Sequence, residues 1–120
     1  MAEPNPEELF NLGMLSYDKQ DFSKARKYFE KACGLNNGDG CSGLGSLYHN
    51  GEGVEEYSKK AAYFYSKVCE LNSGGGCVAL GALYYNGDGV KQDSKKAVAL
   101  FEKPCKLGYK KACEMLKELR

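Results

Sequence analysis

Apolar side chains recur every three or four residues along most of the chain, which is the spacing of amphipathic helices. Leu9 and Leu12 follow Asn5-Pro6, an N-cap residue with proline at the first helical position, and a second apolar series follows Asp21. Turns rich in glycine and asparagine separate the later series. The pattern predicts seven helices and no strands, at about residues 6–18, 22–34, 39–50, 58–71, 74–86, 94–107 and 109–120.

The same residues return at a fixed interval. Cys33 recurs 36 positions later as Cys69 and again as Cys105, and Leu44-Gly45 recurs as Leu80-Gly81. The first interval is shorter, with 32 residues from Leu12-Gly13 to Leu44-Gly45. A period in this range is typical of repeat architectures, in which stacked units share one core. We therefore predict one all-α domain over residues 1–120, a solenoid of α/α hairpins with repeats at about 6–37, 38–73 and 74–109 and a capping helix at about 109–120.

Glycine and proline stand at unusual places in this pattern. Gly13, Gly45 and Gly81 fall inside predicted helices, where glycine costs about 0.5–1 kcal/mol relative to alanine. We expect them where the two helices of a hairpin approach closely. Further glycines leave the predicted first helices, where a positive φ is common, namely Gly51, Gly53, Gly87 and Gly89. Pro104 lies late in a predicted helix, and we expect a kink in its last turn.

The six cysteines form three pairs with one spacing: Cys33 and Cys41, Cys69 and Cys77, Cys105 and Cys113. A zinc or redox site would favour Cys-x-x-Cys, which the chain lacks. An even count at one spacing in a small chain indicates a disulfide framework and an oxidising compartment. Each bridge would join the end of one hairpin to the start of the next, and closing such a short loop is worth about 2.5 kcal/mol.

Charge and hydropathy exclude several classes of function. The net charge is +1, so the chain has no strong positive electrostatic field that would attract nucleic acid or an anionic membrane. We find no apolar run of the roughly 18 residues that a membrane span needs. Residues 1–6 have neither a basic nor an apolar signal-peptide region. The disulfide framework nevertheless indicates an oxidising compartment, so we expect the mature form of a secreted or periplasmic protein, and we expect a monomer.

The repeated unit resembles a known family. Lys-Ala-x5-Lys-x-Cys-x-Leu-Asn, followed by Gly-Cys-x2-Leu-Gly-x-Leu-Tyr-x-Asn-Gly-x-Gly-Val, resembles the Sel1-like repeat, which is related to the tetratricopeptide repeat. The paired cysteines resemble those of the Helicobacter cysteine-rich proteins. The resemblance implies a right-handed solenoid with one disulfide per repeat in an exported protein. It also implies a penicillin-binding protein with weak β-lactamase activity, or a scaffold for proteins or peptides.

The candidate catalytic residues are few. Ser16 and Lys19 match the Ser-x-x-Lys pattern of serine β-lactamases, but no Ser-Asp-Asn or Lys-Thr-Gly accompanies them. Ser16 also takes the place of Tyr48 and Tyr84 in the repeat, on the face that we expect to be packed. His49 is the single histidine and takes the place of a tyrosine, so it needs no ligand role. We predict no metal site and no cofactor.

A binding surface is the better-supported site. Each first helix has a face that we expect to be packed, formed by Leu12, Leu15, Cys41, Leu44, Leu47, Tyr48, Cys77, Leu80, Leu83 and Tyr84. The opposite stripe is Phe10, Asn11, Met14, Tyr17, Ser42, Ser46, His49, Val78, Ala82 and Tyr85. In solenoids of this class the first helices line the concave surface. Apolar side chains beside Asn and Ser suit an extended peptide or a partner helix, unless neighbouring helices cover them.

Three functional hypotheses follow. The first is an exported scaffold that binds a peptide or protein on its concave face. The second is a penicillin-binding protein that takes a β-lactam or a peptidoglycan-like small molecule. The third is a shortened or engineered repeat protein without a selected ligand.

Overall fold

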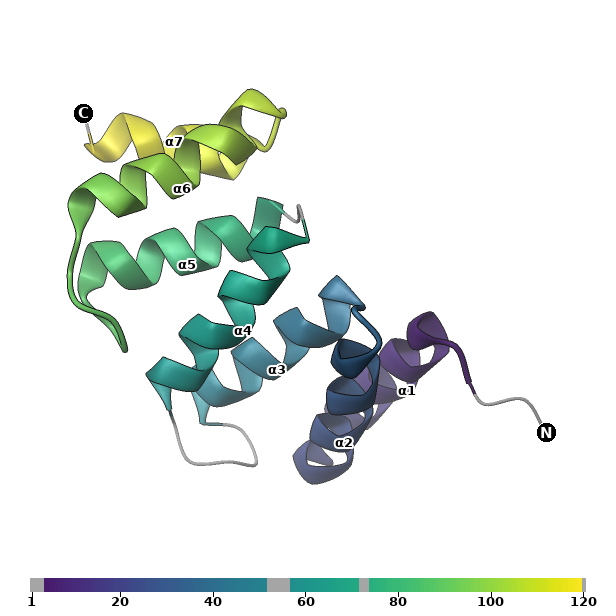
Figure 1. Cartoon of the computed structure of the whole chain (residues 1–120). Coiled ribbons are helices and arrows are strands. Elements are labelled where there is room, and N and C mark those ends of the chain that lie inside the picture. Colours follow the sequence, from purple (N-terminus) through teal and green to yellow (C-terminus); the bar gives the residue numbers. More distant parts are fainter. Residues whose placement is uncertain (1–3, 52–56, 72–73, 120) are drawn as a thin grey trace.

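The computed structural model describes residues 4–51, 57–71 and 74–119. Within these residues it contains seven helices and no strand, as predicted. The helices are α1 (Pro6–Asp18), α2 (Phe22–Gly34), α3 (Gly38–Asn50), α4 (Ser58–Glu70), α5 (Gly74–Asn86), α6 (Ser94–Lys106) and α7 (Lys110–Leu119). They form the hairpins α1/α2, α3/α4 and α5/α6, which stack in chain order, with α7 on α6 and the two termini at opposite ends (Figure 1). The molecule is elongated, 52 × 29 × 21 Å, which confirms the solenoid.

Side-chain caps begin several of the helices. The carboxamide oxygen of Asn5 accepts a hydrogen bond from the Glu8 amide, and Asp21 and Asp93 do the same for the amides three residues on. Asn37 caps α3 in the same way by accepting a hydrogen bond from the Gly40 amide. Helix α3 begins at Gly38, one residue before the predicted start. Each cap satisfies an amide that would otherwise lack a partner, so the starts of these helices are fixed locally.

There are three disulfides, one for each repeat: two connect consecutive hairpins, and the third connects the last hairpin to α7. Each joins the last turn of a second helix to the first turn of the next first helix, with Cα atoms 4.5–4.8 Å apart: Cys33–Cys41, Cys69–Cys77 and Cys105–Cys113. The disulfides therefore hold the junctions between repeats rather than the two helices of one hairpin.

Within each hairpin, an aromatic ring lies against the glycine of the first helix. A Cβ atom placed on Gly13, Gly45 or Gly81 would lie 2.5, 2.7 or 2.6 Å from a ring carbon of Phe29, Tyr65 or Phe101. The predicted close approach is confirmed, but the neighbour is a side-chain ring rather than the backbone of the second helix. The three rings recur 36 residues apart and are buried, so the ring and the glycine together fix the crossing of each hairpin.

The inner first helices lie between two second helices. Helix α3 packs on both α2 and α4, and α5 packs on both α4 and α6. Leu44 and Leu47 are consequently buried, at 1% and 0% exposure. Leu15, their counterpart in the first hairpin, is 57% exposed, so the prediction that it is packed was wrong. No described helix precedes α1 to cover it.

The turns follow the expected backbone geometry where the structure describes them. Gly51, Gly87 and Gly89 have φ of 71°, 70° and 74°, and Gly53 lies outside the described residues. Pro104 is buried, and α6 continues past it to Lys106. No helix among the described residues has the length and apolarity to cross a membrane.

Candidate functional site

Charge is distributed unequally between the two kinds of helix. Helix α3 has one acidic residue, Asp39, besides His49, and α5 has no charged residue at all. The second helices α2, α4 and α6 each carry three or more lysine, arginine or glutamate side chains. On α3 and α5 the exposed positions other than Asp39 are therefore apolar or neutral polar, as expected of a surface that contacts another molecule, whereas α1 carries exposed Glu7, Glu8 and Asp18 near its ends.

On α1 the predicted stripe is partly taken up by internal packing. The ring of Phe10 lies 5.8 Å from that of Phe29, and the ring of Tyr17 lies 5.3 Å from that of Phe22. Met14 is 38% exposed and Asn11 is exposed as well. Asn11 and Met14 are thus the exposed members of the α1 stripe, whereas Phe10 and Tyr17 are half-buried and pack their rings on α2.

On α3 the stripe is half-buried and tied to neighbouring elements. The hydroxyl of Ser46 lies 3.4 Å from that of Tyr65, and Ser42 is partly exposed. The Nε2 atom of His49 lies 3.5 Å from a carboxylate oxygen of Asp88, in the turn after α5. This contact links two consecutive repeats and leaves both side chains 41% exposed.

On α5 the stripe divides between core and surface. Val78 is 9% exposed and packs in a cluster with Ala97 and Phe101, so it is unavailable to a ligand. Ala82 is half-buried and Tyr85 is 42% exposed. The residues left accessible from the three first helices define what we call the first-helix surface: Asn11, Met14, Ser42, Ser46, His49, Ala82 and Tyr85.

Tyr65 of α4 contacts this surface through the hydroxyl of Ser46, and it was not among the predicted site residues. Burial raises the pKa of the Tyr65 phenol, although the hydrogen bond with Ser46 opposes the rise. The phenol therefore stays neutral at physiological pH and holds the Ser46 side chain. Its 36-residue spacing from Phe29 and Phe101 was the available sequence signal.

The Ser16 and Lys19 pair lies at the other side of α1. Both residues line a small hollow of about 150 Å³ together with Asp21 and Lys24. Ser16 is 7% exposed, and its hydroxyl donates a hydrogen bond to the Leu12 carbonyl at 2.9 Å. The serine proton therefore points to the backbone of its own helix rather than to a base. The described residues also contain no cluster of His, Cys, Asp and Glu that could hold a metal ion.

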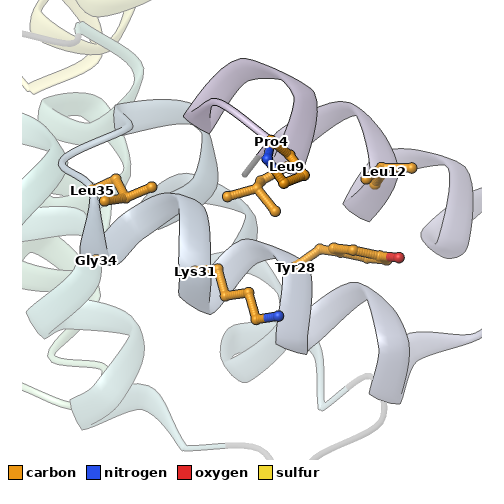
Figure 2. A pocket seen from close by; sticks show the side chains of 7 residues that line it. All are labelled: Pro4, Leu9, Leu12, Tyr28, Lys31, Gly34 and Leu35. Carbon is orange, nitrogen blue, oxygen red and sulfur yellow. The ribbon is translucent and has the colours of Figure 1, made fainter. Parts of the chain in front are cut away.

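A larger hollow, of about 570 Å³, lies at the N-terminal end of the solenoid. Figure 2 shows Leu9 and Leu12 of α1 facing Tyr28 and Lys31 of α2 around it, with Leu35 beside them. We call this surface the N-terminal end face: Leu9, Leu12, Leu15, Tyr28, Lys31 and Leu35. The sequence analysis did not predict this face, because the repeat pattern placed Leu15 among the packed residues although its side chain is 57% exposed.

Comparison with known families places most of the chain, between residues 6 and 109, among helical repeats. The Sel1 repeat matches residues 38–73 and 75–109, and the tetratricopeptide repeat matches residues 6–39. The short first repeat, which lacks the glycine-rich turn, is thus the one that matches the related motif.

Individual proteins with repeats of this kind are also similar to this chain in sequence and in structure. The β-lactamase HcpA of Helicobacter pylori is 52% identical over 61 residues, 51% of this chain and 24% of that protein. The structure of H. pylori cysteine-rich protein B is 48% identical with a TM-score of 0.75, over 78% of this chain and 71% of that one. A protective antigen of uropathogenic Escherichia coli with an SLR fold is 28% identical with a TM-score of 0.89, over 93% of this chain and 25% of that one.

The chain spans about a fifth to a quarter of the length of the curated relatives it matches. Its repeats, its one disulfide per repeat and its identity to cysteine-rich protein B nevertheless agree with one another. This chain belongs to the Sel1 repeat family and is a homologue of the Helicobacter cysteine-rich proteins.

Proposed function

We propose that this protein is an exported scaffold that binds a peptide segment of a partner protein on the concave face, along α1, α3 and α5. The observation that carries the proposal is the near absence of charge on α3 and α5, although Tyr85 is 42% exposed. Solvent alone would favour charged side chains there, as it does on the second helices.

The chemistry of the first-helix surface fits a peptide. Met14 and Tyr85 offer apolar area, and the Asn11 amide and the Ser42 hydroxyl can pair with peptide groups of a ligand. Flexible methionine and amphipathic tyrosine are frequent in such interfaces. A rigid solenoid also presents these groups without having to order them on binding.

The compartment follows from the disulfides and the relatives, which indicate an oxidising, extracytoplasmic location. The partner is therefore expected among secreted, periplasmic or surface proteins. The His49–Asp88 contact adjoins the surface and joins two repeats, so we infer that it keeps the relative position of α3 and α5 during binding.

The experiment begins with a phage-displayed library of random short peptides, selected on the oxidised protein. The best peptide is then titrated by fluorescence anisotropy. We expect Met14→Ala and Tyr85→Ala each to weaken binding by about tenfold, the effect of truncating an interface anchor. Tyr63→Ala is the matched control, because Tyr63 is 65% exposed but lies on the second helix α4. A library without a saturable binder, or an equal loss in Tyr63→Ala, would contradict the proposal and favour a protein without a selected ligand.

A β-lactam is the second candidate ligand, because the relative HcpA is named a β-lactamase. The test is covalent labelling by a fluorescent penicillin, with Ser16→Ala as the variant. Loss of the label in Ser16→Ala would assign Ser16 as the nucleophile. Absence of a label, or a label unchanged by the substitution, would remove Ser16 from that role, as its hydrogen bond to Leu12 leads us to expect.

A further inference from the structure

The turns of the second and third hairpins end in the same backbone geometry but carry different side chains there. Tyr57 and Asp93, which are 36 residues apart, are the N-cap residues of α4 and α6. Their φ and ψ are −148° and 88° for Tyr57 and −154° and 96° for Asp93. The amide of each donates a hydrogen bond to an equivalent tyrosine carbonyl of the first helix, Tyr48 at 3.0 Å or Tyr84 at 2.9 Å. The two side chains therefore leave the backbone at the same place and in the same direction.

In the second hairpin this position places a second aromatic ring beside a cation. The ammonium of Lys60 lies 5.1 Å from the ring centre of Tyr48 and 5.7 Å from that of Tyr57. Tyr57 makes no side-chain cap of α4, so its side chain serves the contact with Lys60 instead. Ammonium groups are attracted to the negative faces of aromatic rings. The second hairpin thus supplies both rings from its own sequence.

The third hairpin has the first ring and the cation but not the second ring. The ammonium of Lys96 lies 5.0 Å from the ring centre of Tyr84. Asp93 stands in the place of Tyr57, and its carboxylate accepts the Lys96 amide at 3.1 Å. A hollow of about 490 Å³, which we call the turn pocket, lies beside these groups and is lined by Tyr84, Val90, Lys91, Gln92, Asp93 and Lys96. Its volume is within the range of about 300–1,000 Å³ that is typical of ligand pockets.

The lining of the turn pocket suits an aromatic side chain next to a carboxylate. Tyr84 and Val90 are half-buried and pack against the core cluster of α4 and α5, so they provide apolar area. Lys91 and Lys96 are exposed and provide two ammonium groups. The carboxylate that the described lining contains, that of Asp93, is already bound to the backbone of α6. The excess of positive charge therefore favours an acidic ligand.

The turn pocket adjoins the first-helix surface. Gln92 lines the pocket, and its side-chain amide donates a hydrogen bond to the Tyr85 carbonyl at 2.8 Å. This bond ties the turn to the end of α5, where the side chain of Tyr85 is 42% exposed and belongs to the first-helix surface. A peptide that lies on that surface can therefore continue past Tyr85 into the pocket.

We propose that the turn pocket is a subsite for an aromatic side chain of the partner peptide, with a carboxylate on the neighbouring residue. The ring lies beside Lys96 as the ring of Tyr57 lies beside Lys60, and the carboxylate faces Lys91. Tyrosine is the expected residue, because it fills the equivalent position in the second hairpin. This proposal rests on the proposed peptide-binding function and names a residue that the peptide contributes.

The test uses a capped dipeptide, N-acetyl-Glu-Tyr-amide, which is too short to cover the first-helix surface. The corresponding Glu-Leu dipeptide removes the ring, and the Lys-Tyr dipeptide reverses the charge. Binding to the oxidised protein is measured and located by amide chemical shifts in NMR spectra. We expect the Glu-Tyr dipeptide to bind saturably, with shifts confined to the turn between α5 and α6 and the adjoining helix ends. The other two dipeptides should bind several-fold more weakly.

Substitutions in the turn separate the roles of ring and charge. Asp93→Tyr places in the pocket the ring that the second hairpin already carries, and it should abolish the saturable shifts. Asp93→Asn is its matched control, because asparagine keeps a cap and adds no ring. Lys96→Met should weaken the Glu-Tyr dipeptide about threefold. Lys91→Glu, at an exposed position, should weaken it several-fold and improve the Lys-Tyr dipeptide, whereas Lys95→Glu, exposed on α6 but outside the pocket, should change neither.

Four outcomes overturn the proposal. The first is no saturable binding of the Glu-Tyr dipeptide, and the second is equal binding of the Glu-Leu dipeptide, which would remove the preference for a ring. The third is a set of shifts that neither Asp93→Tyr nor Lys91→Glu alters, which would place the dipeptide elsewhere. The fourth is equally tight binding of 4-hydroxyphenylacetate, which would make the ligand a small aromatic acid rather than a peptide.

The same data distinguish this subsite from the first-helix surface. Met14→Ala should leave the dipeptide shifts unchanged, because Met14 lies on α1 and outside the turn pocket. A library peptide that depends on Met14, together with no binding of the dipeptide, would refute the subsite alone. Binding of the dipeptide without any library peptide that depends on Met14 would instead refute the extended peptide site along the first helices.

Discussion

Gly81→Ala tests the physical basis of the repeat. In an ordinary helix this substitution stabilises the protein by about 0.5–1 kcal/mol, because alanine has the higher helix propensity. Here the new methyl group would lie 2.6 Å from one ring carbon of Phe101 and 2.9 Å from another. The ring cannot move aside easily because Phe101 is 0% exposed.

The magnitude follows from these two opposed effects. Overpacking a filled core costs about 1–3 kcal/mol, and the upper part of that range applies to a rigid, fully buried ring. After the propensity gain is subtracted, Gly81→Ala should lower the free energy of unfolding by about 1–2 kcal/mol. Phe101→Leu in the same chain should recover part of the loss, since it shortens the side chain that clashes.

Urea unfolding of the oxidised variants, followed by far-UV circular dichroism, measures this change. The matched control is Gly34→Ala, because nothing lies within 4 Å of a Cβ atom placed at Gly34 in α2. Gly34→Ala should leave stability unchanged or raise it slightly. If Gly81→Ala proves as stable as the original chain, the packing of Phe101 on Gly81 is not what fixes the hairpin crossing.

Three further outcomes are expected. Replacing Cys69 and Cys77 together by alanine should lower the free energy of unfolding by about 2–3 kcal/mol in urea, and a smaller effect than that of a single exposed substitution would contradict the bridging role. Asp93→Ala removes the acceptor of the Lys96 amide and should cost about 1 kcal/mol, with exposed Ser94→Ala as a control that changes little. Because burial raises the pKa of Tyr65, the unfolded chain loses that proton at lower pH than the folded one, and stability should fall as the pH rises above about 10. Tyr65→Phe should show less of this fall in unfolding curves recorded between about pH 8 and 11, and an identical fall would refute the assignment.

The repeat pattern was sufficient for the architecture because each of its residues has a local role. Asn5, Asp21 and Asp93 cap helices through contacts three residues away, so their function is visible in the sequence. The cysteines stand at the ends of helices that the pattern already placed. Helix number, order and disulfide pairing were predictable for these reasons.

The faces of the first helices were not predictable in the same way. Helix α5 is apolar on all sides because α4 and α6 pack on it from two directions, so no single polar stripe marks its exposed side. Val78 was consequently assigned to the surface although it is buried. Leu15 was assigned to the core because its counterparts are buried, but burial at this position comes from a neighbouring second helix, and none of the described helices packs on Leu15 in that way.

The most direct test of the stapled solenoid is the mass of the protein after thiol alkylation, with and without prior reduction. The account requires no alkylation of the unreduced protein and six alkyl groups after reduction, since the structure has no free cysteine. Proteolysis of the unreduced protein should release the linked pairs Cys33–Cys41, Cys69–Cys77 and Cys105–Cys113. Free thiols or crossed pairs in the protein purified from an oxidising compartment would contradict it.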